Sequence, residues 1–395
     1  MEKIIYLDNA ATTRVAPEVF DAMIPYFCEQ YGNPSSAYTF SGKIAAELVD
    51  ARERIAGAIG AKGREIFFTS GGSESDNWAI KGVADALSDK GNHIITTKIE
   101  HHAVLNTCDF LEKHGFEVTY LDVDDKGSVS PEDVEKAIKP TTILISVMFA
   151  NNEIGTIEPV AEIGKIARKH GVLFHTDAVQ AFGHVPVNVD EMNIDLLSAS
   201  AHKLNGPKGI GLLYVRSGTR INNLIHGGAQ ENGKRAGTTN APGIIGFDKA
   251  VELATSRMKE RSEHERRLRD RLIERVLGEI PYTILNGDSK ERLSNNANFC
   301  FRYVEGESLL IMLDQNGICA SSGSACTSGS LDPSHVLLAI GLPHEIAHGS
   351  VRLTLSEETS EQDIDYTADK LKQIVERLRS MSPLYEDMLA GKKEA

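Results

Sequence analysis

The sequence of 395 residues has few cysteines, and they follow no pattern. Their number is odd and their spacing irregular, with no CxxC pair; they are Cys28, Cys108, Cys300, Cys319 and Cys326. Disulfide frameworks and structural zinc sites need paired or regularly spaced thiols, so the sequence argues against both. Free thiols are typical of a reducing compartment, and we therefore expect a cytoplasmic protein.

Long apolar runs and targeting signals are also missing. No apolar stretch approaches the roughly 20 residues that a membrane-spanning helix needs. The first residues, MEKIIYLDNAATT, lack the basic start, apolar stretch and small-residue cleavage site of a signal peptide. The sequence therefore predicts neither a membrane segment nor a secretion signal.

Positive charge is in deficit, and the common nucleotide-binding loops are absent. The formal net charge of -14 argues against a dedicated nucleic-acid surface, because phosphate backbones are bound by clustered positive charge. Neither GxxxxGK[ST] nor GxGxxG occurs, which speaks against a P-loop and against a Rossmann dinucleotide site.

Short apolar runs alternate with helical patterns from Ile66 to Tyr214. The runs predicted as strands are EIFF, HIITT, EVTYL, TILISVMF, VLFHTD, DLLSAS and GLLYV, and helical patterns such as WAIKGVADAL and AEIGKIARKHG lie between most of them. Such alternation predicts an α/β fold with a mostly parallel sheet flanked by helices. We expect this large domain to span residues 15–255.

A smaller α/β domain is predicted from residues 1–14 and 256–395. The stretch from Ile244 to Ile280 has the pattern of one long helix that bridges the two domains. Farther along the chain, ANFCFRYV and VRLTL have the pattern of strands, whereas ESLLIMLDQNG and residues 361–379 have that of helices.

Polar and glycine-rich segments follow the predicted strands, which is where open α/β sheets bind ligands. In TSGGSESDN, Gly71 and Gly72 allow a ligand to approach the backbone, and Ser73 offers a hydroxyl near a helix start that favours phosphate. The alternative is an ordinary strand-to-helix turn with a serine cap.

Lys203 and Asp177 stand at the ends of two further predicted strands. A lysine beside packed strands can lose its charge and form a Schiff base, although a surface lysine is the commoner case. An aspartate that enters a buried region needs a cationic partner. That partner is either the protonated ring nitrogen of a cofactor or a basic side chain in a structural ion pair.

His101 and Arg352 are further candidates. An imidazole at His101 suits stacking on a flat ring and proton transfer; the alternative is that one of the adjacent His101 and His102 lies in the core and the other in solvent. Neighbouring residues on a regular element point apart, so the two histidines do not predict a metal pair. Arg352 offers a two-pronged guanidinium to a substrate carboxylate, or else forms an ion pair between domains.

Cys326 lies in SSGSACTSGSLDP, a segment whose serines and glycines predict an exposed loop. Free cysteines are usually buried, so an exposed one indicates a reactive thiol, with an incidental surface thiol as the alternative. The other four cysteines lie in apolar or regular stretches and are interpreted as packing residues.

The segment HEIAH, from His344 to His348, matches the zinc-protease pattern HExxH. That chemistry needs a sustained helix, whereas Pro343 and Gly349 bound this segment closely and no third ligand is evident. We therefore predict no metal site.

Taken together, the motifs resemble those of a known family. The segments are YLDNAATT, YGNPSS, TSGGSESDN, EHHAV, NNEIG, HTDAVQ, SAHKLNGPKGIG, GGAQENGKRAGTTN, SSGSACTSGS and GSVRLTL. They resemble the NifS/IscS-type cysteine desulfurases, which belong to the class V aminotransferase-like group of pyridoxal-phosphate enzymes. The resemblance runs over nearly the whole chain in the family order, and it implies the PLP-dependent transferase fold of type I.

The resemblance also implies roles for individual residues. Lys203 would form the internal Schiff base, Cys326 would carry sulfur as a persulfide, and His101 would stack over the cofactor ring and move protons. The implied cofactor contacts are Gly72, Ser73, His101, Asn152, Asp177 at the pyridine nitrogen, Gln180 at the ring hydroxyl, Ser200, His202, Lys203 and the partner subunit's Thr238. The implied substrate contacts are Asn33, Asn152 and Arg352.

The activity that the resemblance implies is cysteine desulfuration, in which L-cysteine becomes L-alanine and its sulfur passes to Cys326. A homodimer would then hand the sulfur to an acceptor protein, such as an iron-sulfur scaffold, for iron-sulfur cluster assembly or other thio-cofactor synthesis. From the negative net charge and the lack of long apolar runs, we expect no direct contact with nucleic acid or a membrane. The end of the chain, SPLYEDMLAGKKEA, departs from the family's scaffold-docking extension and leaves the acceptor open. A plain aminotransferase, a non-catalytic scaffold and a zinc peptidase are the alternatives.

Overall fold

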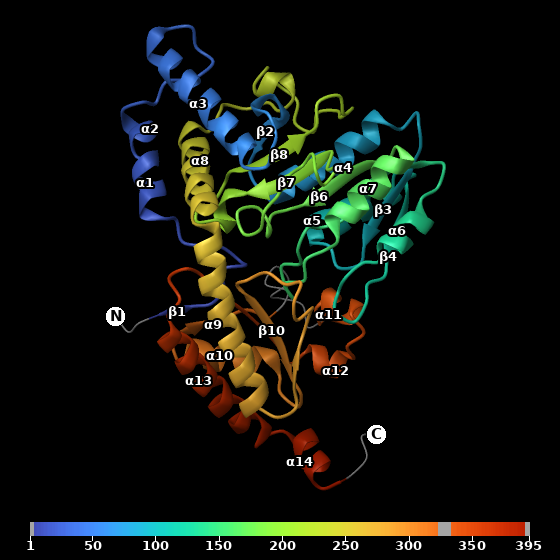
Figure 1. The fold of residues 1–395 in the computed structure, drawn as a ribbon, viewed down its shortest axis with the longest axis vertical. Helices are drawn as coiled ribbons and strands as arrows, with labels where there is room; N and C mark the ends of the chain where they lie inside the picture. The colour runs from blue at the N-terminus through green and yellow to red at the C-terminus, as the bar shows by residue number, and fades with distance from the viewer. Residues whose placement is uncertain (1–3, 323–332, 392–395) are drawn as a thin grey trace.

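A seven-stranded sheet forms the centre of the larger part of the molecule (Figure 1). The structure is a computed structural model that describes residues 4–322 and 333–391. The strand order is β2-β8-β7-β6-β5-β3-β4, and the strands are β2 (Ile66–Thr69), β3 (His93–Thr97), β4 (Glu117–Leu121), β5 (Thr142–Ser146), β6 (Leu173–Asp177), β7 (Leu196–Ser200) and β8 (Gly211–Val215). β8 runs antiparallel to both of its neighbours, β2 and β7, and the other described pairings in the sheet are parallel, so the predicted mostly parallel sheet is confirmed.

Helices cover both faces of this sheet, which confirms the other half of the prediction (Figure 1). On one face, Trp78 and Cys108 lie in a buried cluster with the strand residue Leu144. The helices of this face are α4 (Gly72–Ala86) and α5 (His102–Glu112). A second cluster covers the other face and draws on α1 (Pro17–Met23), α3 (Thr39–Gly57), α6 (Pro131–Ala137), α7 (Val160–His170) and α8 (Ala241–Ser256). None of the described helices has the length and apolar character that crossing a bilayer requires.

Burial on both faces explains the near-continuous apolar runs of the central strands. Every residue of β3, β5 and β7 is buried. Because β3, β5, β6 and β7 run parallel, their carboxyl ends meet at one edge of the sheet. The last residues of these strands are Thr97, Ser146, Asp177 and Ser200.

The smaller part of the molecule has its own sheet and its own core. The antiparallel sheet has the order β12-β10-β9, and Phe299 and Val351 pack from it against Leu272 and Leu371 of two helices. The elements are β9 (Thr283–Leu285), β10 (Asn296–Phe301), α10 (Gly306–Asp314), α11 (His335–Ala339), α12 (His344–Ala347), β12 (Ser350–Thr354), α13 (Glu361–Arg379) and α14 (Pro383–Leu389). The strands and helices predicted for this region are thus present.

Two helices, and not the predicted single one, connect the two parts (Figure 1). α8 ends at Ser256, α9 (Met258–Glu279) begins two residues later, and Arg257 between them has a ψ of 5° that leaves the helical range. α8 contributes to the core of the larger part and α9 to that of the smaller part. On these separate cores we propose that residues 15–255 form one domain, and residues 1–14 and 256–395 the other.

The N-terminus belongs to the smaller core. β1 (Ile5–Tyr6) pairs in parallel with β11 (Ile318–Cys319), and Asp8 forms a bridge with Thr354 of β12. The chain then crosses to the larger part, where the N–H of Thr13 donates to the carbonyl of His202 at 3.0 Å. This crossing places the first residues beside the carboxyl ends of the large sheet.

Glu158 is a carboxyl buried in the larger part, with 4% of its surface exposed. Its Oε2 accepts the N–H of Val129 at 2.9 Å, and its Oε1 has no hydrogen-bond partner among the described residues. Burial is the main cause that raises the pKa of Glu158 from 4.5 to about 8. The folded protein therefore keeps a proton on Glu158 that the unfolded chain releases near pH 4.5.

We predict that this proton makes the free energy of unfolding decrease from pH 5 to pH 8, because only the unfolded state loses it there. Glu158→Gln cannot titrate, so relative to the wild type it should gain about 3 kcal/mol over that interval. Urea unfolding at both pH values measures the difference, with the exposed Glu132→Gln as control. Equal pH dependence in Glu158→Gln and the wild type would contradict this assignment.

Candidate active site

Lys203 lies where the edge of the large sheet meets the N-terminal segment. It ends a short turn, η2 (Ala201–Lys203), directly after β7. Its Nζ donates to the carbonyl oxygens of Ala10 at 2.6 Å and of Ala11 at 2.8 Å. Gln180, from the turn after β6, donates through Nε2 to the same Ala10 carbonyl at 3.0 Å. Two predicted site residues therefore meet on one stretch of backbone.

Asp177 is a buried carboxyl at the end of β6, with 6% of its surface exposed. Its Oδ1 accepts the N–H of Val179 at 2.9 Å. Burial raises the pKa of Asp177 to about 6, while the Val179 N–H and the charge of Lys203 act in the opposite direction. Asp177 is therefore an anion at neutral pH, in a place that favours a cation.

A buried polar network lies behind Asp177. His175, two residues earlier on the same strand, shares hydrogen bonds with Ser146 Oγ at 2.8 Å and with Ser198 Oγ at 3.0 Å. Asp76 Oδ1, from α4, lies 3.7 Å from His175 Nε2. Burial, followed by the charge of Asp177, raises the pKa of Asp76 well above its usual range, and burial lowers that of His175 to about 3. His175 is therefore a neutral imidazole at neutral pH, and the burial that disfavours charge on Asp76 favours leaving the negative charge on Asp177.

His101 is the N-cap of α5 and a neutral imidazole. Its Nδ1 accepts the N–H of Ala103 at 3.1 Å, so the neutral ring carries its proton on Nε2. Burial, followed by the charge of Lys203, lowers the pKa of His101 to about 4. The ring of His102 packs instead against that of His335, with 4.7 Å between centroids. The two adjacent histidines thus have different neighbours.

A glycine turn between β2 and α4 leaves room for a ligand. Gly71 has a φ of 157° and a ψ of -179°, and a Cβ there would meet only Ser200 Oγ, at 3.8 Å, among the described atoms. Gly211 packs closely behind the turn, since a Cβ on it would lie 2.7 Å from Gly71 Cα. Gly72 begins α4 and the exposed Ser73 follows, so the free N–H groups of the first helical turn suit an anion.

His202 and Arg352 also contact the N-terminal segment that accepts hydrogen bonds from Lys203. His202 Nδ1 lies 3.1 Å from Thr12 Oγ1, and burial, followed by the charge of Lys203, lowers its pKa to about 4. Arg352 donates through Nη1 to the carbonyl of Asn152 at 2.9 Å and through Nη2 to Asp8 Oδ1 at 2.8 Å. The structure therefore brings Arg352 and Asn152 together, and Asp8 is an additional partner.

The described part of the chain does not join three predicted site residues, Asn33, Thr238 and Cys326, to the residues around Lys203. Asn33 is exposed, and its Oδ1 accepts the N–H of Ser35 at 3.0 Å. Thr238 is exposed ahead of α8. Within residues 4–322 and 333–391, neither of them hydrogen-bonds to the residues around Lys203. Cys326 lies outside the described residues.

The cysteines predicted to pack in the core and the HEIAH motif have different outcomes in the structure. The interpretation of cysteines as packing residues fits the buried Cys108 and Cys300, but it is wrong for Cys28, which is exposed. Cys28 ends α2 (Pro25–Cys28), a helix too short to have a buried face. The HEIAH motif forms only the single turn of α12, and the described part of the chain holds no group of three potential metal ligands.

The contacts that sequence reasoning missed come from the segment YLDNAATT. Ala10 and Ala11 act through backbone carbonyls, which no residue type reveals. Asp8 and Thr12 act through side chains, but their partners lie 344 and 190 positions away along the chain. The motif itself was the only available signal, because its residues have no pattern of their own that indicates a binding role.

The chain is similar in sequence to several known proteins. Residues 5–367 match the family described as Aminotransferase class-V. A protein named Cysteine desulfurase IscS from Clostridium botulinum (strain Hall) is 59% identical over 396 residues. The alignment covers 100% of this chain and 100% of that protein. A protein of the same name from Methanosarcina thermophila is 58% identical over 97% of this chain and 94% of its own length.

Solved structures agree with these relatives. A NifS-like protein superposes with a TM-score of 0.90 and 38% identity, over 95% of this chain and 100% of its own. A structure described as SspA in complex with cysteine superposes with a TM-score of 0.81 and 41% identity, over 90% of this chain and 100% of its own. These likenesses extend over both parts of the fold.

We predict that Lys203→Met loosens the N-terminal segment, because the variant loses the two hydrogen bonds to the carbonyls of Ala10 and Ala11. Amide hydrogen exchange in peptides covering residues 5–14 should become about tenfold faster. The control is Lys98→Met, which removes an exposed ion pair with Asp122. Unchanged exchange in residues 5–14 would show that Lys203 does not hold this segment.

Proposed function

The chain belongs to the class V aminotransferase family and, within it, to the cysteine desulfurases, and on this premise we propose that it converts L-cysteine into L-alanine and carries the sulfur as a persulfide. One observation carries the proposal: an amine, a buried carboxylate and a neutral imidazole, those of Lys203, Asp177 and His101, gather at one edge of the sheet. Such a set suits the chemistry of an amino acid bound to a pyridoxal-type ring.

Pyridoxal 5'-phosphate is the proposed cofactor, and two features of the chain fit it. The buried anion Asp177 matches a protonated ring nitrogen, and the open glycine turn at Gly71 matches a phosphate. When bound, this group supplies an electron sink for the negative charge left at the α-carbon of the substrate. The residues proposed to hold it are Gly72, Ser73, His101, Asn152, Asp177, Gln180, Ser200, His202, Lys203 and the partner subunit's Thr238.

Lys203 has two proposed tasks. Its Nζ binds the cofactor and, once released, takes the proton from the α-carbon of the substrate as general base. The carbonyls of Ala10 and Ala11 lie within hydrogen-bond distance of Nζ and limit where it can move. His101 is proposed to stack over the cofactor ring and to assist proton movement there, and its uncharged imidazole presents the Nε2–H as a hydrogen-bond donor. Arg352 and Asn152 orient the substrate carboxylate, together with Asn33.

Sulfur transfer is assigned to Cys326. Its thiolate attacks the sulfur of the substrate cysteine, so that an S–S bond forms while the C–S bond breaks. The carbon takes up the electron pair and a proton, which leaves alanine as the product. The persulfide then passes to an acceptor protein, in iron-sulfur cluster assembly or other thio-cofactor synthesis. A plain aminotransferase has no use for this thiol.

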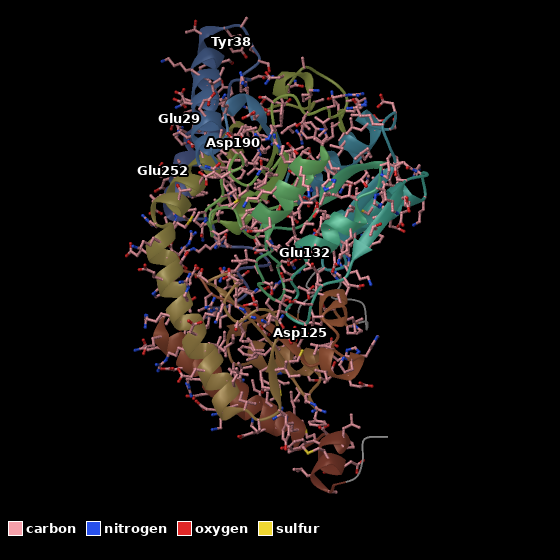
Figure 2. The ribbon with its side chains drawn as sticks, turned by 45° about the vertical axis from the view of Figure 1, so that its right-hand side comes forward. Glu29, Tyr38, Asp125, Glu132, Asp190 and Glu252 are labelled. Carbon is pink, nitrogen blue, oxygen red and sulfur yellow. The ribbon has the colours of Figure 1, made fainter. Side chains whose placement is uncertain are left out.

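The working form is proposed to be a homodimer. Large apolar side chains stand exposed from α1 to the start of α3, and they are Phe20, Ile24, Phe27, Tyr31, Tyr38 and Phe40. Figure 2 shows Tyr38 and Glu29 on the outer edge of the larger part, far from the smaller part. Exposed apolar surface of this kind favours association. Sedimentation should give twice the mass of the chain, and a monomer would contradict the proposal.

The cellular location is proposed to be the cytoplasm. The described cysteines, Cys28, Cys108, Cys300 and Cys319, are all free, which suits a reducing compartment. Fractionation of cells that produce the protein tests this, and recovery from an oxidising compartment would contradict it.

The decisive experiment follows absorbance, alanine and protein mass after L-cysteine is added to the holoenzyme without reductant. We predict that a visible cofactor band shifts, that alanine is released, and that Cys326 gains the mass of one sulfur. Cys326→Ser should keep the band and lower alanine release at least about 100-fold, because the sulfur has no acceptor. Cys28→Ser, at an exposed thiol, is the matched control and should behave as the wild type.

Two outcomes would contradict the proposed function. Full alanine release by Cys326→Ser would favour chemistry that does not need this thiol. A colourless protein that takes up no added pyridoxal phosphate would overturn the cofactor assignment and, with it, the proposed reaction.

A further inference from the structure

The N-terminal segment places a carboxylate on the arginine that is proposed to bind the substrate. Asp8 Oδ1 accepts from Arg352 Nη2 at 2.8 Å, and Arg352 Nη1 donates to the carbonyl of Asn152 at 2.9 Å. The side chain of Arg352 is 2% exposed and that of Asp8 is 19% exposed. The carboxylate is therefore the more accessible member of the pair, and the cation is covered.

The backbone on either side of Asp8 is hydrogen-bonded to the strand that carries Arg352. On one side of Asp8, the carbonyl of Leu7 accepts the N–H of Thr354 at 2.7 Å. On its other side, Asn9 Nδ2 donates to the carbonyl of Thr354 at 2.8 Å. Arg352 lies two residues before Thr354 on β12. The pair is thus preorganised, unlike exposed ion pairs that must order two long side chains.

The charges of the pair have a consequence for any carboxylate that enters the site. A covered guanidinium without a counter-ion is costly, and Asp8 neutralises that of Arg352 at hydrogen-bond distance. A substrate brings its own carboxylate, which an arginine attracts by charge and by paired hydrogen bonds. This second carboxylate meets a cation that is already neutralised, so its attraction is weaker than that of a lone arginine.

We propose that Asp8 is a positioning residue that fixes the guanidinium of Arg352 and moderates its affinity for carboxylates. The inference rests on the proposed function, in which Arg352 binds the carboxylate of cysteine. Because alanine carries the same carboxylate as cysteine, moderate affinity allows the product to leave. It also limits retention of unrelated anions.

The charge of Asp8 can be separated from its hydrogen bond with Asp8→Asn, which keeps an oxygen acceptor for Arg352 but removes the negative charge. The probe is 3-mercaptopropionate, which has the thiol and carboxylate of cysteine but no amine. We expect its inhibition constant to fall about fivefold in Asp8→Asn, because Arg352 then attracts carboxylates more strongly. The KM for L-cysteine should fall in the same direction without a gain in kcat.

The counter-ion itself can be tested without catalysis. Asp8→Ala removes the carboxylate and leaves space on Arg352, so sodium formate should raise the thermal unfolding temperature of this variant more than that of the wild type. Sodium chloride at equal ionic strength separates this effect from general salt effects. Glu18→Ala removes the exposed partner of Arg257, and formate should not stabilise it selectively.

An inhibition constant in Asp8→Asn equal to or above that of the wild type would overturn the proposal. A formate effect in Asp8→Ala no larger than in the wild type would overturn it as well. If the wild type releases no alanine from cysteine, the proposed function fails, whereas the formate experiment still decides whether Asp8 is the counter-ion of Arg352.

Discussion

The burial of the Asp177 carboxylate is the constraint on which the rest of the site depends. A sheet covered on both faces by helices leaves its strand ends as the place where polar groups emerge, and β6 ends there with an anion. Burial raises the pKa of Asp177 to about 6, which still leaves it charged at neutral pH. A buried anion requires a nearby cation. His175, on the same strand, is neutral, so the positive charge that Asp177 requires must come from Lys203 or from a bound cation.

The N-terminal segment joins this edge of the large sheet to the smaller part of the molecule. The carbonyls of Ala10 and Ala11 accept from Lys203, whereas Asp8 binds Arg352 on β12. The amine and the guanidinium therefore depend on one short stretch of chain for their placement. A substrate that contacts both groups, as proposed, therefore requires the two parts of the molecule to keep their relative positions.

Much of the fold and part of the candidate site could be predicted from the sequence, and the features that were missed have physical reasons. The strands of the large sheet were predicted because each is a short apolar run, but the reversed direction of β8 leaves no mark in such a run. The break at Arg257 was missed because no proline or glycine marks it, and residues that suit a helix continue on both sides of it. Lys203 and Asp177 were predicted as site residues from their positions after strands, and the structure places both at the carboxyl edge of the sheet. Ala10 was missed because its backbone carbonyl makes the contact.

Asp177 is proposed to be the buried anion that holds a cationic cofactor ring. The most direct measurement is the affinity of the cofactor-free protein for pyridoxal phosphate at pH 7.5, compared between the wild type and Asp177→Asn, which has the same shape and no charge. We expect at least tenfold weaker binding by the variant, since about 1.4 kcal/mol of charge interaction corresponds to one factor of ten. Equal affinity and an equal cofactor spectrum in the two proteins would contradict it.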